Sequence, residues 1–161
     1  YLHPGQLLIT KENIPIVTIL GSCVAVIIHS PETGLSGIFH ALLPEHRIKK
    51  NVIAGHPPVS PDPEYVDFAF YYMKYRFGES GISLNRTNLM LFGGSDVLKA
   101  AAGSGKSVTV GKQNIIMAKK ILEKEHIKLS CEDTGGSSGR KIVFLPAEGT
   151  AYVQYLERFG E

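Results

Sequence analysis

The stretch CVAVIIHSPETGLSGIFHALL, residues 23–43, decides the fold class of this chain. Its first seven residues, 23–29, form a short, β-branched and nearly continuous apolar run, which is typical of a buried strand. Residues 30–34 combine Ser, Pro, Glu, Thr and Gly, a composition that favours a turn. The apolar run of residues 35–43 then predicts a second strand, which ends before Pro44. The stretch therefore predicts a β-hairpin.

Further strands are predicted on both sides of this hairpin. An apolar, β-branched segment at residues 14–20 precedes it. Shorter strands are expected at residues 6–10, 89–92, 127–131, 141–145 and 150–156. Because strands outnumber the helices that follow, the sequence predicts a mixed α/β (α+β) domain with substantial antiparallel pairing.

Two helices are predicted between these strands. Asp62 is a suitable N-cap for the first helix, and Gly78 can end it. The second helix is expected over residues 113–125. The first helix carries one apolar stripe at helical spacing, formed by Val66, Ala69, Phe70, Met73 and Phe77.

Composition describes one globular domain over residues 1–161 and excludes several classes of protein. Hydrophobic residues make up 43% of the chain and charged residues 20%, which argues against extended disorder. A net charge of +2 is too small to indicate a nucleic-acid partner. The longest apolar stretch, residues 17–28, is too short for a membrane helix of about 20 residues. We therefore expect a cytoplasmic protein without membrane insertion.

No metal or nucleotide site is expected from the motifs. The two cysteines, Cys23 and Cys131, lie far apart and form no CxxC pair, which disfavours zinc. Cys131 has no suitably spaced histidine and is interpreted as structural. The segment 105–107, Gly-Lys-Ser, resembles the end of a P-loop, but Ala100 stands where that pattern requires glycine.

Cys23 is the candidate nucleophile, because a thiol becomes reactive beside a base. His29 is excluded as that base, since six residues of strand separate the two by roughly 20 Å. If a two-residue turn at residues 31–32 closes the hairpin, His40 lies directly opposite Cys23, whereas a five-residue loop places His40 opposite Val24. Spacing alone also leaves the alternative of an inert buried cysteine and a hydrogen-bonded strand histidine.

The residues just before Cys23 favour a catalytic interpretation. Gly21 and Ser22 predict a bend, at which the backbone N–H groups of Ser22 and Cys23 could form an oxyanion hole. Thr18 could turn back to hydrogen-bond His40 as the third member of a triad. Its alternative role is that of an ordinary strand threonine.

These residues resemble the chemoreceptor glutamine deamidase family, CheD. The motifs that carry the resemblance occur in family order along most of the chain. They are TILGSCVAV (18–26), GIFHALLP (37–44), FGG (92–94), VGKQN (110–114), EDTGG (132–136) and GRKIVF (139–144).

The resemblance implies an enzyme that converts glutamine side chains of chemotaxis receptors to glutamate. It implies Cys23 as nucleophile, His40 as base and Thr18 as the third catalytic residue, with no cofactor. It also implies two packed mixed β-sheets flanked by helices, as in toxin-type cysteine deamidases. The implied partners are the cytoplasmic helices of a receptor and a CheC-type phosphatase. Two alternatives stay open, namely a docking module with an idle dyad and a cysteine hydrolase that acts on receptor methyl esters.

Overall fold

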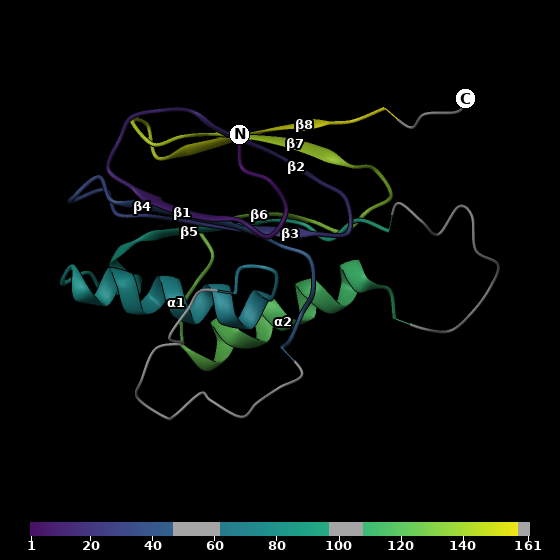
Figure 1. The fold of residues 1–161 in the computed structure, drawn as a ribbon, viewed down its shortest axis with the longest axis horizontal. Helices are drawn as coiled ribbons and strands as arrows, with labels where there is room; N and C mark the ends of the chain where they lie inside the picture. Colours follow the sequence, from purple (N-terminus) through teal and green to yellow (C-terminus); the bar gives the residue numbers. More distant parts are fainter. Residues whose placement is uncertain (47–61, 97–107, 158–161) are drawn as a thin grey trace.

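Two β-sheets and two α-helices form three layers in the computed structural model (Figure 1), which describes residues 1–46, 62–96 and 108–157. The smaller sheet lies on one side of the larger sheet, and both helices lie on the other side. Residues 47–61, which include Pro57, Pro58 and Pro61, lie outside the described residues, as does the Gly-Lys-Ser segment at 105–107.

The larger sheet has the strand order β1-β4-β3-β5-β6. Its neighbouring strands are antiparallel except for the parallel pair β5–β6. Every residue of β3 and β4 is buried, because this sheet is covered on both faces. The strands are β1 (Leu7–Thr10), β3 (Val24–His29), β4 (Ser36–Ala41), β5 (Asn88–Gly93) and β6 (Cys131–Thr134).

The smaller sheet is antiparallel and has the strand order β2-β7-β8, formed by β2 (Ile16–Leu20), β7 (Arg140–Leu145) and β8 (Thr150–Tyr155). Burial alternates along β7, so that one face of this sheet packs on the larger sheet. The layer between the sheets is an apolar cluster of Leu2, Ile16, Leu20, Ala25, Ile27, Ile38, Met90, Phe92, Ile142 and Phe144.

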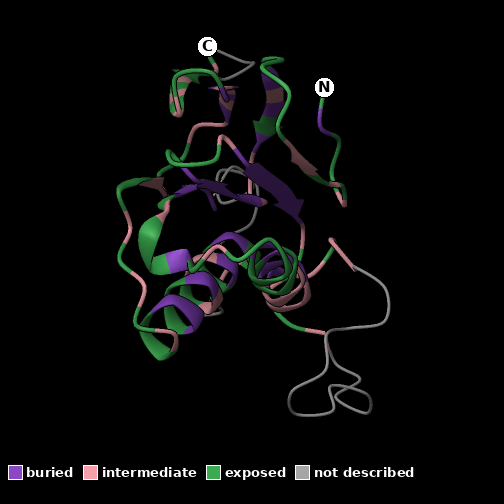
Figure 2. Cartoon of the chain, turned by 90° about the vertical axis from the view of Figure 1, so that its left-hand side faces the viewer, coloured by how far each residue is buried: buried purple, intermediate pink, exposed green. Residues whose placement is uncertain are grey.

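Helices α1 (Val66–Glu79) and α2 (Val110–Lys124) cover the opposite face of the larger sheet, and a short 3₁₀ helix, η2 (Leu84–Arg86), follows α1. Buried residues lie on the helix faces that contact the sheet, and exposed residues lie on the outer faces (Figure 2). The predicted stripe of α1 is confirmed, because its five residues are the buried residues of that helix.

Helix α1 starts later than predicted. The carbonyl of Glu64 accepts hydrogen bonds from the N–H groups of Leu42 and Leu43, each at 2.9 Å, and Tyr65 forms a parallel bridge with Leu43. The chain just after Asp62 therefore pairs with the end of β4 before it can enter a helix. Asp62 is accordingly not the N-cap, a position that Tyr65 occupies. Nor does Gly78 end the helix, which continues to Glu79.

The predicted hairpin is present, but both registers considered from the sequence are wrong. His40 pairs with Ala25, and Val24 pairs with Ala41. The reason is the turn, which takes four residues, 31–34, between Ser30 and Leu35. A two-residue hairpin turn needs a positive φ at one of its residues, which proline cannot adopt. The positive φ of 73° falls instead on Gly34.

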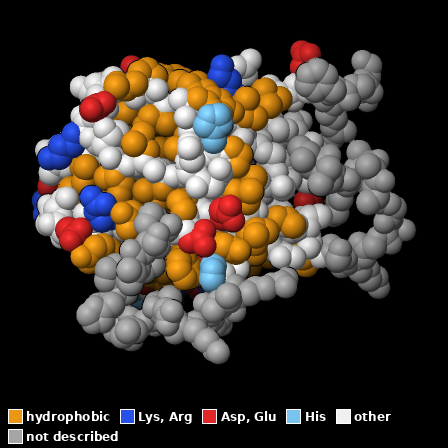
Figure 3. Space-filling view, viewed as in Figure 1, with side chains coloured by type: hydrophobic (Ala, Val, Ile, Leu, Met, Phe, Trp, Pro, Cys, Tyr) orange, Lys and Arg blue, Asp and Glu red, His pale blue; other side chains and the backbone are white. Residues whose placement is uncertain are grey.

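The predicted fold class is confirmed: the chain has two packed sheets with helices in an α+β arrangement. The structure adds that both helices cover one face of the larger sheet and that the smaller sheet is wholly antiparallel. Within the described ranges, no helix has the length and apolar character needed to cross a bilayer. In the view of Figure 3, hydrophobic side chains are spread over much of the surface, and charged side chains occur singly or in small groups.

Candidate active site

Cys23 and His40 lie on the face of the larger sheet that packs against the smaller sheet. Cys23 directly precedes β3, is half-buried and packs against the apolar cluster between the sheets. His40 is 1% exposed in β4 and is paired with Ala25, two residues from Cys23 along β3. Because side chains alternate along a strand, the two-residue offset keeps Cys23 and His40 on one face as diagonal neighbours.

Thr18 reaches His40 from the opposite sheet. It is fully buried in β2, and its Oγ1 lies 2.8 Å from Nδ1 of His40. The single hydroxyl proton of Thr18 is donated to the carbonyl of Leu2, also at 2.8 Å. The hydroxyl can therefore only accept from His40, which places the imidazole proton on Nδ1. Nε2 of His40 is then the basic nitrogen, and it is buried without a partner among the described residues.

Burial keeps both groups of the pair uncharged. It lowers the pKa of His40 from 6.5 to about 4. It also raises the pKa of the Cys23 thiol, and the residue's own backbone N–H opposes this with a smaller lowering effect. A neutral thiol beside a neutral imidazole is thus favoured over a thiolate–imidazolium ion pair. Such a pair can act by general-base catalysis, in which the proton leaves sulfur as sulfur attacks.

The turn before β3 is held in place by hydrogen bonds that its three carbonyl groups accept. The carbonyl of Gly21 accepts from the N–H of Ser95 at 2.8 Å, and the carbonyl of Cys23 accepts from the N–H of Gly94 at 2.7 Å. Between them, the carbonyl of Ser22 accepts from Nδ2 of Asn114 at 3.0 Å. In the described part of the chain, the N–H groups of Ser22 and Cys23 donate to no backbone carbonyl. Backbone N–H groups that bond no carbonyl and lie beside a nucleophile are suited to stabilise an oxyanion.

Three residues around this turn, Gly94, Ser95 and Asn114, were not predicted as functional. The only sequence signal for Asn114 was its place in the VGKQN motif. The side chain that the sequence excluded, His29, lies at the far end of β3 and hydrogen-bonds Ser36 at 2.9 Å.

The second cysteine of the chain lies outside the site. Cys131 is exposed at the start of β6. The described residues contain no group of three or more His, Cys, Asp or Glu side chains that could hold a metal ion.

A hollow of about 510 Å³ opens next to the end of β4. Tyr65, Val110 and Gln113 line it, so it lies between the starts of the two helices and the segment that follows His40. The remaining lining residues are Leu43, Pro44, Glu45 and His46.

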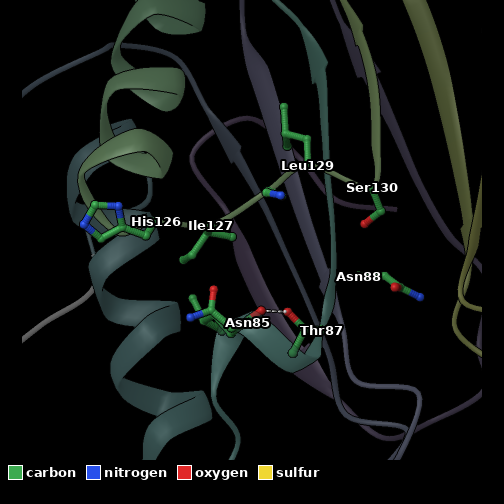
Figure 4. A pocket seen from close by; sticks show the side chains of 9 residues that line it. Asn85, Thr87, Asn88, His126, Ile127, Leu129 and Ser130 are labelled. Carbon is green, nitrogen blue, oxygen red and sulfur yellow. Dashed lines mark hydrogen bonds between the residues drawn. The ribbon is translucent and has the colours of Figure 1, made fainter.

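A second hollow, of about 390 Å³, lies at the opposite end of β5 and is shown in Figure 4. Asn88, the first residue of β5, lines it, whereas Gly93 at the other end of the strand pairs with Val24 beside the site. Its histidine, His126, is exposed. This hollow is therefore separate from the Cys23–His40 pair.

Comparison with known proteins shows that residues 42–155 match the sequence model of the CheD family, which is described as CheD chemotactic sensory transduction. The matched segment begins just after His40. Known relatives match nearly the whole chain, and the chain also covers most of each of the three named below.

The three relatives carry the names of probable chemoreceptor glutamine deamidases. CheD 1 of Anaeromyxobacter dehalogenans is 35% identical over 97% of this chain and 84% of the relative. CheD 2 of Geobacter sulfurreducens is 32% identical, with 98% and 90% covered. CheD of Saccharophagus degradans is 31% identical, with 96% and 69% covered.

Proposed function

The chain belongs to the CheD family, and from this premise we propose that it is a cytoplasmic protein-glutamine deamidase that acts on chemotaxis receptors. Residues 1–161 would form its single catalytic domain. The observation that carries the proposal is the hydrogen bond from His40 to Thr18, which leaves Nε2 of His40 as a base on the same face as Cys23. The names of the relatives supply the substrate class.

In the proposed reaction, Nε2 of His40 takes the proton of the Cys23 thiol as sulfur attacks the carboxamide carbon of glutamine. The imidazolium then returns this proton to the departing nitrogen, so that ammonia leaves and a thioester forms. Water, deprotonated by the same nitrogen, attacks the thioester and releases glutamate and free Cys23. Each step uses His40 once as base and once as acid, so protons balance without a cofactor.

Two further groups assist in this proposal. The N–H groups of Ser22 and Cys23 would stabilise the oxyanion of both tetrahedral intermediates. Thr18 would keep the proton of His40 on Nδ1, as the third member of a triad does. The buried hydrogen bonds of Thr18 support this role.

The substrate would be a glutamine on a cytoplasmic receptor helix. The hollow beside β4 is close to His40 in sequence, because Leu43 and Pro44, three and four residues after it, line the hollow. We therefore assign the approach of the substrate helix to this side. The segment 45–61 is a further candidate for reading the receptor, because of its length and its position after His40, but it lies largely outside the described residues.

The test is peptide mass spectrometry on a receptor cytoplasmic fragment incubated with the protein. We expect specific conversion of glutamine to glutamate, and we expect Cys23→Ser to abolish it while leaving the fold intact. Cys131→Ser is the matched control, because it removes the exposed thiol outside the site and should keep full activity. Substantial turnover by Cys23→Ser would remove Cys23 as nucleophile.

A docking module is the second candidate, and the burial of Nε2 of His40 favours it, because a buried base is closed to substrate in this conformation. Its partner would be the receptor or a CheC-type phosphatase. Retention of a receptor fragment by Cys23→Ala, without conversion by the unmodified protein, would favour docking. Parallel assays on methyl-esterified and amide peptides separate deamidation from ester hydrolysis.

A further inference from the structure

Asn114 connects the two segments that carry the proposed catalytic pair. The residue is fully buried in the first half of α2. Its Nδ2 donates one hydrogen bond to the carbonyl of Ser22 and one to the carbonyl of Leu42, each at 3.0 Å. Ser22 directly precedes Cys23, and Leu42 follows His40 by two residues. One amide group therefore holds the nucleophile turn and the end of the base-bearing strand together.

The orientation of this amide is fixed by its partners. Turning it over would direct Oδ1 at two carbonyl oxygens, so only the observed orientation is compatible with both hydrogen bonds. Oδ1 is consequently buried without a partner among the described residues. An unpaired buried acceptor costs stability. Asn114 therefore costs stability through its unpaired Oδ1, while its Nδ2 gives a hydrogen bond to each of the two carbonyls at the site.

Among the described residues, no other side chain holds the turn through its carbonyls. The carbonyls of Gly21 and Cys23 accept from backbone N–H groups, whereas the carbonyl of Ser22 accepts from the side chain of Asn114. The helix that carries Asn114 is seated firmly on the same region. A Cβ built on Gly111 would lie 2.6 Å from the carbonyl oxygen of Gly94, so the backbones already touch.

We propose that Asn114 is a positioning residue: it sets the separation between the Cys23 turn and the His40 strand, and thereby the geometry of proton transfer between thiol and imidazole. This inference rests on the proposed function of the Cys23–His40 pair. Diagonal neighbours on a sheet lie about 7–8 Å apart, with their Cβ atoms somewhat closer, and only long or aromatic side chains readily span this separation. A shift of about 1 Å between the two segments can therefore cost roughly 100-fold in rate.

The experiment measures how strongly His40 assists Cys23, with iodoacetamide as a probe that needs no receptor. All proteins carry Cys131→Ser, so that Cys23 is the only thiol. At pH 7 we expect His40→Gln to slow alkylation of Cys23 by about tenfold or more, because general-base assistance is lost. In Asn114→Leu, which keeps a similar volume but has no donor, we expect the same His40→Gln change to have almost no effect.

Ala118→Gly is the control for a simple loss of helix stability. Ala118 lies one turn further along α2 on the same buried side, where it packs in the apolar cluster between the helices and the larger sheet. We expect this variant to be destabilised while the His40→Gln effect on alkylation stays as large as in the parent. Asn114→Ala, which removes the donor together with most of the side chain, gives a second variant in case Leu does not fold.

Turnover of the receptor fragment adds an independent reading. We expect Asn114→Leu to lower kcat roughly 10- to 100-fold with KM within about twofold, because substrate binding does not use this residue. An unchanged His40→Gln effect in both Asn114 variants would overturn the positioning role. Strong coupling that depends on Asn114, in a protein that converts no glutamine, would support this role and reject the proposed substrate. No His40→Gln effect in the parent would overturn both.

Discussion

A hydroxyl group orients His40 where many catalytic triads use a carboxylate. Thr18 fixes the proton of the imidazole on Nδ1, but it brings no negative charge that would stabilise an imidazolium. Burial then acts unopposed, which explains why the pKa of His40 falls to about 4. The resting site is therefore a neutral pair, and charge would develop only as the thiol attacks.

Thr18→Val tests the orienting role, because valine keeps the shape and removes the hydroxyl. We expect kcat to fall about 10- to 100-fold, by analogy with the hydrogen-bond partners that orient metal-binding histidines. Stability should fall by about 1–3 kcal/mol, since Nδ1 of His40 and the carbonyl of Leu2 lose their partner. Thr87→Val is the matched control, because the Thr87 hydroxyl donates to the Leu84 carbonyl at 2.7 Å, at the end of β5 that is remote from the site. Equal losses of kcat in the two variants would contradict the role of Thr18.

The pKa of His40 also predicts how stability depends on pH. Above pH 6.5, His40 is neutral in both the folded and the unfolded chain. As the pH falls from 6.5 towards 4, the unfolded chain binds a proton at this position and the folded chain does not, so the free energy of unfolding falls. Urea titrations give the free energy of unfolding at each pH. Plotted against pH from 6.5 to 4, this free energy should fall more steeply for the parent than for His40→Gln. Parallel curves would mean that the folded and unfolded pKa values are the same.

At the scale of elements, the hairpin shows what sequence can and cannot determine. Apolar runs and turn residues were enough to predict both strands, because burial and turn chemistry are local properties. The register depended on which residue adopts a positive φ, and Gly34 took that role instead of a tight turn at residues 31–32. The register that places His40 opposite Cys23 is wrong by two residues, an even number, so Cys23 and His40 still share a face. A shift of one residue would have separated them.

Helix α2 shows the opposite case, in which the missing information is tertiary. The predicted helix began at Gln113, whereas the structure begins it at Val110, with Thr109 as N-cap. Within the shorter helix Asn114 is only a polar residue near the start. Its importance comes from the Ser22 and Leu42 carbonyls, 92 and 72 residues away in sequence. The spacing of apolar and polar residues along the helix gives no information on these partners.

The contact between α2 and the Cys23 turn predicts that Gly111→Ala is damaging. The three atoms nearest to the added Cβ are all backbone atoms, at 2.6 to 2.9 Å, so the start of the helix must move away from Gly94 and Ser95. We expect a loss of about 1–3 kcal/mol in the free energy of unfolding. Turnover should fall as well, because Asn114 moves with the helix. Gly78→Ala in α1 is the control: its Cβ meets nothing within 4 Å, and we expect a gain of about 0.4–1 kcal/mol. A Gly111→Ala protein as stable and active as Gly78→Ala would contradict the close seating of α2.

At the scale of the whole molecule, Arg140 joins the two sheets behind the site. It belongs to β7, is 2% exposed and forms a 2.6 Å ion pair with Asp133 of β6 in the larger sheet. Its guanidinium also donates to Oγ of Ser95 at 3.1 Å and to the carbonyl of Gly135. Ser95 in turn holds the carbonyl of Gly21. The sheet that carries Thr18 is thus fastened to the sheet that carries His40.

Arg140→Met tests this connection, because methionine fills much of the space without hydrogen bonds. Removing one partner of a buried ion pair costs about 3–5 kcal/mol. Asp133 keeps a quarter of its side chain exposed and a 2.7 Å hydrogen bond from Tyr155, so we expect a value near 3 kcal/mol. For a chain of this length that corresponds to a fall in Tm of about 6–12 °C by calorimetry.

Arg86→Met is the control. It removes an ion pair whose side chains are both more than half exposed, and it should cost less than about 1 kcal/mol. Equal falls in Tm would show that the sheets are held by their apolar layer alone. The expected difference would mean that the buried ion pair, and not the apolar layer alone, holds the sheet that carries Thr18 on the sheet that carries His40.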